Sequence, residues 1–173
     1  MKKAILLLMI ATMPMMINSQ ELSLILQSND FKASSPIPLQ HAHLHGNISP
    51  HFAWSNIPAN TVSFAFICHD PDAPSGNFIH WILFNIPASM HELPQGISTQ
   101  QLRKFGVQAG ENDFGRAQYD GPQPPSGKHR YIFTLYALDS SLPLKDMAAY
   151  QDVMKALSSH IIASCSLIGT FSA

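Results

Sequence analysis

The sequence predicts a mainly β protein, a β-sandwich with one helix added near the C-terminus. Three observations support this fold class: short apolar runs rich in Phe, Ile and Tyr, long segments with Pro and Gly between them, and one late stretch with helical periodicity. The chain has 173 residues and 46% of them are apolar, which is enough for the core of one domain. We find no internal repeat and no linker, so the sequence predicts one domain after its N-terminal segment.

The N-terminal segment has the pattern of a secretory signal peptide. Two lysines precede an apolar stretch (residues 4–12), and Ser19 offers a small residue before a cut. The alternative is a membrane anchor, but this stretch is shorter than the roughly 20 residues that a spanning helix needs. We therefore expect residues 1–19 to be removed. The remaining domain, residues 20–173, would have no transmembrane segment and would lie in the periplasm or outside the cell. Mass spectrometry of the exported N-terminus tests this.

Short apolar runs separated by Pro and Gly are the predicted strands. They cover Leu22–Leu26, Val62–Asp70, His80–Ile86 and Arg130–Asp139. The long stretches Ser34–Asn60 and Asp113–Lys128 are predicted loops with short turns of structure, because Pro and Gly interrupt any regular period there.

One segment, Asp146–Ser164, has the spacing of a helix. Apolar side chains recur there at intervals of three and four residues: Met147, Tyr150, Met154, Leu157 and Ile161. We expect Asp146 to be the N-cap, since an Asp side chain can accept from the first free backbone N–H groups. After the helix, Cys165–Phe171 is expected to form a last short strand or an extended tail.

The charge and cysteine content exclude some classes of partner and site. Only 12% of residues are charged and the formal net charge is −1, where a globular protein usually has about 25% charged residues. The sequence has no basic stripe and no long charge run, so we do not expect nucleic acid as a partner. Cys68 and Cys165 have no metal-site spacing, and each lies in an apolar run, so we expect free thiols.

Strand geometry predicts that four polar side chains meet at one rim of the sheet. The run that ends at Asp70 and the run that begins at His80 would form a hairpin, which places both residues at the same end. His129 and Tyr131 enter the third strand two residues apart, and side chains at that spacing point to the same face. If this strand neighbours the hairpin in the matching direction, all four side chains converge.

These four side chains suit the binding of a small oxyanion. Two imidazoles and a phenol can all donate hydrogen bonds, and Asp70 can accept from an imidazole or from an amine on the ligand. The Pro- and Gly-rich loops beside them would form stiff walls. Arg130 lies on the opposite strand face by alternation, so we expect it to be a structural or surface partner.

Two other functions stay open from the residues alone. An Asp–His pair could perform general acid–base chemistry on a phosphoester, although the chain has no nucleophile elbow, no P-loop and no strong metal motif. Alternatively, His41, His43 and His45 would share one face of a strand and could bind zinc or copper.

Several motifs carry a resemblance to a known family. They are DPDAP (70–74), HW (80–81), NDFG (112–115) and YDGPQPPSGKHRYIFTLYALD (119–139). Together they resemble the phosphatidylethanolamine-binding protein family, and more narrowly its bacterial and archaeal branch, described as Raf kinase inhibitor-like. The match spans most of the chain after the predicted signal peptide, with the motifs in the right order.

This resemblance implies an antiparallel β-sandwich of two sheets with a small anion site at one rim. It assigns ligand binding to six residues by motif position: Asp70, Pro74, His80, Gly121, His129 and Tyr131. Of these, Pro74 and Gly121, with the rest of the loop to Pro125, would line the opening. The implied function is non-enzymatic binding of phosphate-bearing head groups or similar small anions, with no cofactor and no metal. Some family members are described as inhibitors of kinases or serine proteases, so a protein partner of that kind is a further implied activity.

Overall fold

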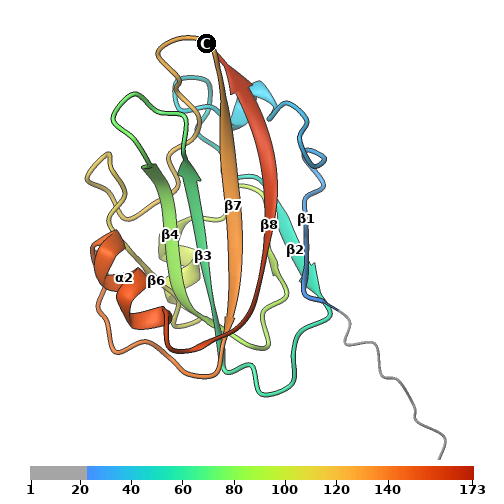
Figure 1. Ribbon diagram of the computed structural model, residues 1–173, viewed down its shortest axis with the longest axis vertical. Coiled ribbons are helices and arrows are strands. Elements are labelled where there is room, and N and C mark those ends of the chain that lie inside the picture. Colours follow the sequence, from blue (N-terminus) through green and yellow to red (C-terminus); the bar gives the residue numbers. More distant parts are fainter. Residues whose placement is uncertain (1–22) are drawn as a thin grey trace, which may run out of the picture.

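Two antiparallel β-sheets form the fold of residues 23–173, the part of the chain that this computed structural model describes (Figure 1). The smaller sheet has the order β1–β2–β5, with bounds Ile25–Gln27, Phe52–Ser55 and Glu92–Leu93. The larger sheet has the order β6–β4–β3–β7–β8, with bounds Gln108–Ala109, Phe78–Pro87, Ser63–Asp70, Lys128–Leu138 and Ile161–Ser172. Every neighbouring pair runs antiparallel, which confirms the predicted antiparallel β-sandwich.

Short helices lie in the connections between the strands. They are the 3-10 helix η1 (Leu39–His41), α1 (Thr99–Arg103) and α2 (Tyr150–Leu157). Within residues 23–173, no helix is both long enough and apolar enough to cross a membrane. The predicted signal peptide, residues 1–19, lies outside the described residues and stays a prediction.

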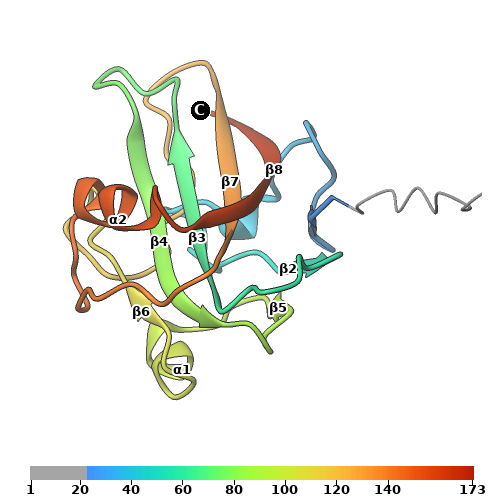
Figure 2. The same cartoon turned by 60° about the horizontal axis from the view of Figure 1, so that its bottom comes forward.

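Strand β3 lies at the centre of the large sheet because it is apolar on both faces. Every side chain from Ser63 to Cys68 is buried. Phe64 and Phe66 face the small sheet, whereas Ala65 and Ile67 pack on the other face under α2. Figure 2 shows α2 and the small sheet on different sides of the large sheet. The sequence of β3 therefore needs a cover on both faces, and the fold supplies both.

Aromatic rings fill the space between the two sheets. The ring centroid of Phe52 in β2 lies 4.9 Å from that of Phe66 and 4.7 Å from that of Phe133 in β7. Trp81 of β4 meets Phe66 edge to face at 5.6 Å. Burial of this apolar surface is the main stabilising term of such a sandwich. The packing of these rings also fixes the positions of β3, β4 and β7, and the ends of these strands carry the candidate site.

The helix is shorter than predicted and the last strand is longer. α2 covers Tyr150–Leu157 instead of Asp146–Ser164, and β8 already begins at Ile161. Ile161 lies at helical spacing from Leu157, but it is also the first residue of a strand. An apolar residue at such a boundary satisfies both periods, so spacing alone could not end the helix correctly.

The predicted helix cap is also corrected. The residue before α2 is Ala149, which makes no side-chain capping bond. The carboxylate of Asp146 instead accepts from the backbone N–H of Ala109 and from Nε of Arg103, both at 2.9 Å. Asp146 thus ties the chain before α2 to β6 and α1.

The other strand predictions differ from the structure mainly at their ends. β4 begins at Phe78, two residues before the predicted start at His80, and β7 begins at Lys128. The predicted loop Ser34–Asn60 contains η1 and β2. Cys68 is buried and Cys165 is half-buried, and neither forms a disulfide within the described residues.

Candidate functional site

A cavity of about 340 Å³ lies at the rim where β3 ends and β4 and β7 begin. Antiparallel pairing brings these strand ends together, because Asp70 pairs with Phe78 on one side and His69 pairs with Ile132 on the other. Five of the six predicted site residues line this cavity: Asp70, Pro74, His80, His129 and Tyr131. The predicted convergence of four polar side chains is therefore seen in the structure.

Asp70 and His129 form a buried pair in the cavity wall. Nδ1 of His129 lies 2.7 Å from Oδ2 of Asp70, and the two side chains are 8% and 4% exposed. Because a carboxylate accepts, His129 donates from Nδ1, and its Nε2 has no partner among the described residues. Oδ1 of Asp70 accepts from the backbone N–H of Asp72 at 2.8 Å. The turn after β3 thus holds the carboxylate, and the carboxylate orients the imidazole.

His80 is held by a different acceptor. Its Nδ1 lies 2.6 Å from the backbone oxygen of Asp120. A carbonyl can only accept, so Nδ1 carries the proton and Nε2 keeps a lone pair. Burial lowers the pKa of His80, and the hydrogen bond to Asp120 opposes that shift only in part. The ring is therefore neutral near pH 7. It packs against the rings of Phe78 and Tyr131, with centroids 5.1 Å away in each case.

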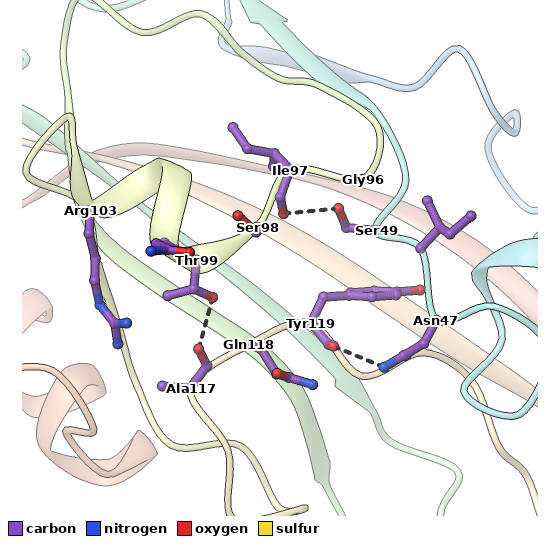
Figure 3. A pocket seen from close by; sticks show the side chains of 12 residues that line it. Asn47, Ser49, Gly96, Ile97, Ser98, Thr99, Arg103, Ala117, Gln118 and Tyr119 are labelled. Atoms are coloured by element: carbon purple, nitrogen blue, oxygen red, sulfur yellow. Dashed lines mark hydrogen bonds between the residues drawn. The ribbon is translucent and has the colours of Figure 1, made fainter.

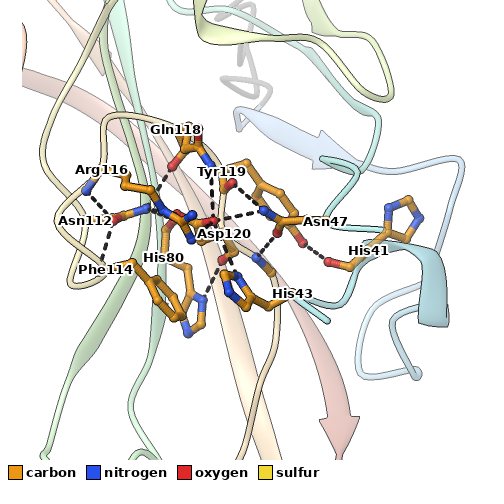
Figure 4. Close-up of polar contacts among 11 residues, drawn as sticks. His41, His43, Asn47, His80, Asn112, Phe114, Arg116, Gln118, Tyr119 and Asp120 are labelled. Atoms are coloured by element: carbon orange, nitrogen blue, oxygen red, sulfur yellow. Dashed lines mark hydrogen bonds and ion pairs between the residues drawn. The ribbon is translucent and has the colours of Figure 1, made fainter. Parts of the chain in front are cut away.

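The fully buried carboxylate of Asp120 holds the loop behind His80 (Figure 4). It accepts from Nε and Nη2 of Arg116 at 3.0 and 2.6 Å, from Asn112 at 2.7 Å and from Asn47 at 2.9 Å. The backbone N–H of Asp120 donates to the carbonyl of His80 at 3.2 Å. The carboxylate therefore locates the loop, and the loop fixes the tautomer of His80.

The hydroxyl of Tyr131 is a buried donor without a partner. The residue has no exposed surface, and its hydroxyl forms no hydrogen bond within residues 23–173. Burial raises the pKa of Tyr131 well above its usual value, and the charge of Asp70 adds to the shift. The hydroxyl thus keeps its proton and can donate. Since an unpaired buried polar group costs about 1–3 kcal/mol, a ligand acceptor at this point would be stabilising.

Sequence reasoning missed the apolar walls of the cavity. Phe78 and Phe114 line it and meet edge to face, with centroids 5.1 Å apart. Phe78 precedes His80 by two residues, so strand alternation alone could have placed both on one face. Phe114 lies in a loop that only the NDFG motif marked. The predicted loop after Asp120 completes the opening with Gln123, Pro124 and Pro125.

The structure does not place Gly121 on the cavity wall, which corrects its predicted role. Gly121 is buried, and its backbone N–H donates to Oδ1 of Asn47 at 2.8 Å. A Cβ at this position would overlap the carbonyl oxygen of His41 and lie 3.1 Å from the backbone nitrogen of His43. Glycine is needed here because two loop backbones pack directly on each other.

The three histidines of the preceding loop do not come together. They lie in η1 and in the turns after it, so alternate residues do not share a strand face. His41 is fully buried with Nδ1 2.7 Å from the carbonyl of Ile48, His43 stacks on Phe114 at 4.6 Å, and His45 is exposed. Within the described residues, no three His, Cys, Asp or Glu side chains are grouped to hold a metal ion. The metal-site hypothesis for these residues is therefore not supported.

Arg130 does not line the cavity and pairs with Asp72 instead. Nε and Nη2 of Arg130 lie 2.8 and 2.6 Å from the two carboxylate oxygens. These hydrogen bonds lower the pKa of Asp72 to about 2. The backbone N–H of Arg130 donates to the same carboxylate at 2.9 Å. The pair thus fastens the turn after β3 to the start of β7.

Another cavity, of about 490 Å³, lies between α1 and the loop before β2 (Figure 3). Its hydroxyl groups are already bonded: Ser49 donates to the carbonyl of Ile97 at 3.5 Å, and Thr99 donates to that of Ala117 at 2.8 Å. None of its lining residues carries a buried polar side-chain atom without a partner. We therefore assign the candidate site to the smaller cavity at the rim.

A solved structure shows the same two-sheet fold. The crystal structure of Escherichia coli YbcL, described as a new member of the mammalian PEBP (phosphatidylethanolamine-binding protein) family, matches with a TM-score of 0.82 and 31% sequence identity. The match covers 88% of this chain and 99% of that chain. The fold is therefore a β-sandwich of the PEBP class.

The sequence comparison gives the family itself. The pattern described as "Phosphatidylethanolamine-binding protein" matches residues 27–172, and the chain belongs to this family. A UPF0098 protein of Methanothermobacter thermautotrophicus is 40% identical over 146 residues, which cover 84% of this chain and 97% of that protein. The UPF0098 protein YbhB of Escherichia coli is 40% identical over 154 residues, with 84% and 98% covered. These matches confirm the family resemblance seen in the motifs.

Proposed function

We propose that this protein is a non-enzymatic binding protein whose rim cavity holds a small anion, such as phosphate or the phosphate-bearing head group phosphoethanolamine. The observation that carries the proposal is that one cavity gathers donors which lack partners among the described residues. The hydroxyl of Tyr131 has no acceptor. His129 in its imidazolium form donates from Nε2, with its charge balanced by Asp70 at 2.7 Å.

The size and walls of the cavity favour a head group over a whole lipid. Its volume of about 340 Å³ is at the lower end of the roughly 300–1,000 Å³ typical of ligand sites. The family description names phosphatidylethanolamine. The released head group of that lipid, phosphoethanolamine, is a phosphomonoester that also carries an amine. The phosphate would accept from Tyr131 and His129, and Asp70 in the same wall offers carboxylate oxygens to an amine. The rings of Phe78 and Phe114 would exclude water around the bound group.

Among the described residues, the cavity offers no serine that is paired with a base as a nucleophile for phosphoester hydrolysis. Ser75 lines the opening, but it makes no hydrogen bond to His129 within the described residues. A serine nucleophile requires such a contact with its base. A regulatory role towards a kinase or a serine protease rests on the family resemblance, and no residue of the cavity is specific to it.

Replacing His129 with alanine is expected to weaken binding of phosphate and phosphoethanolamine by about 10-fold or more. The change removes a charge-assisted hydrogen bond, which contributes about 1.5–3 kcal/mol. Isothermal titration calorimetry in a buffer without phosphate or sulfate measures the effect.

His160→Ala is the matched control for this experiment. His160 also pairs with an aspartate, with Nδ1 2.8 Å from Oδ1 of Asp139, but its side chain is 37% exposed and precedes β8, far along the sheet from the cavity. The affinity of the His160→Ala variant for both ligands should equal that of the wild type. Absence of heat with both ligands, or wild-type affinity in His129→Ala, would contradict the proposal. Hydrolysis of p-nitrophenyl phosphate that Asp70→Asn abolishes would overturn its non-enzymatic part.

A further inference from the structure

We infer that His80 makes the cavity select phosphoryl groups that carry a proton, that is, phosphomonoesters and hydrogen phosphate, over sulfate and phosphodiesters. This inference rests on the proposed function, because it assumes that the rim cavity binds an anion. It adds the class of anion: the family description names a lipid whose phosphate is a diester, and the inference favours monoesters, such as the released head group, over that diester.

One hydrogen bond of His80 has a fixed direction. Nδ1 of His80 lies 2.6 Å from the backbone oxygen of Asp120, so the ring must donate there. A neutral ring then presents the lone pair of Nε2, which has no partner within residues 23–173. His80 thus offers an acceptor to the cavity, where Tyr131 offers a donor and His129 offers a second donor when its ring is an imidazolium balanced by Asp70.

The surroundings keep His80 in this form. Its side chain is 3% exposed, and burial lowers its pKa. The loop that carries the carbonyl of Asp120 is fixed against His80, because Arg116, Asn112 and Asn47 all bond to the Asp120 carboxylate. A carbonyl held this firmly selects one tautomer of the ring.

The charged and titratable groups around His80 are few. Asp70 at the end of β3 shares the cavity wall with it, as do His129 and Tyr131 on β7. From the loop before β2, His43 lies with its Nδ1 3.4 Å from Oδ1 of Asp120 and stacks on Phe114, whose ring meets that of His80. The carboxylate of Asp120 is satisfied by donors from the loops, including both nitrogens of the Arg116 fork. Asp70 and Asp120 act to raise the pKa of His80, but burial is the larger effect and acts in the opposite direction.

An acceptor at this point distinguishes between anions. A phosphoryl group with one P–OH can donate to Nε2 of His80 while its other oxygens accept from Tyr131 and His129. Sulfate and a phosphodiester carry no proton at neutral pH, so an anionic oxygen would face the lone pair of Nε2. Leaving that buried acceptor unpaired is expected to weaken binding by about 10-fold or more.

Calorimetry with four small anions tests the inference. Inorganic phosphate and methyl phosphate should each bind the wild type at least about 10-fold more tightly than sulfate and dimethyl phosphate. A suitable condition is about pH 6.5. The second pKa of a phosphomonoester is about 6, so a fraction of the ligand still carries its proton there. Vesicles of phosphatidylcholine with and without phosphatidic acid distinguish a lipid monoester from a soluble one, and binding of either monoester supports the inference.

The variant His80→Gln tests whether His80 causes the selectivity. An amide can turn either its oxygen or its nitrogen towards the ligand, so the ratio of phosphate to sulfate affinity should fall to near one. The same ratio should not change in His160→Gln. If His80→Gln does not fold, the ¹⁵N spectrum of the wild-type imidazoles replaces it: the inference requires the Nδ1–H tautomer of His80 with and without phosphate.

The outcomes separate this inference from the proposed function. Equal affinity for sulfate and phosphate in the wild type, or a His80 protonated on both nitrogens, overturns the inference and leaves anion binding intact. No binding of any of the four anions overturns the proposed function as well.

Discussion

Replacing Gly121 with alanine is expected to lower the free energy of unfolding by about 3 kcal/mol or more, because the new methyl group has no space. A Cβ there would overlap the carbonyl oxygen of His41 and lie 2.9 Å from its carbonyl carbon. Both are backbone atoms of the loop that contains His41 and His43. A hydrogen bond holds this loop against the Gly121 loop, because the N–H of His43 donates to the carbonyl of Pro122 at 3.0 Å. The loops would have to separate. Urea denaturation followed by circular dichroism measures the loss.

Gly127→Ala is the control for this prediction. Gly127 lies in the same loop region with φ of 73°, and a Cβ there would meet nothing within 4 Å. Its substitution should lower the free energy of unfolding by only roughly 1–2 kcal/mol, the cost of placing a residue with a Cβ in the left-handed conformation. Equal losses in the two variants would show that the close contact between the loops is not the cause.

Replacing Asp120 with alanine should cost about 3 kcal/mol of stability, because it leaves several donors without their acceptor. The amides of Asn112 and Asn47 and the Arg116 fork all bond to this carboxylate. Asn112 is 3% exposed, so water cannot fully replace the lost bond. The loop that sets the tautomer of His80 would also loosen, so the affinity for phosphate should fall together with the stability.

Arg103→Ala is the control, because it removes an Arg–Asp pair on the surface and leaves the bond from the N–H of Ala109 to Asp146 in place. The Arg103 and Asp146 side chains are 47% and 38% exposed, and exposed pairs contribute only about 0–1 kcal/mol. Urea titration of both variants should therefore give a clearly larger loss for Asp120→Ala. A loss no greater than that of Arg103→Ala would mean that the buried network around Asp120 does not stabilise the fold.

Much of the site could be predicted from the sequence because strand geometry is simple. A period of two placed His129 and Tyr131 on one face, and Pro71 after Asp70 marked where β3 ends. Once β3 pairs with β4 and β7, the rim follows from the strand ends. The same rule of alternation placed Arg130 on the other face, where it bonds Asp72.

The parts that could not be predicted depend on loops and on boundaries. Asp120 meets Asn47 across 73 residues of sequence, and no local period indicates such a contact. The helix prediction failed at Ile161 because one apolar residue fits both a helix end and a strand start. The three loop histidines were assigned to a strand, but the chain forms a 3-10 helix and turns there, which separates their side chains.

A crystal structure of the protein purified without phosphate or sulfate, then soaked in phosphate, tests the central claim most directly. We expect one phosphate in the rim cavity, within hydrogen-bond distance of Nε2 of His129 and the hydroxyl of Tyr131. Its protonated oxygen should face Nε2 of His80. A cavity that holds only water at a phosphate concentration that saturates binding in solution would contradict the account, since the anion would then bind elsewhere.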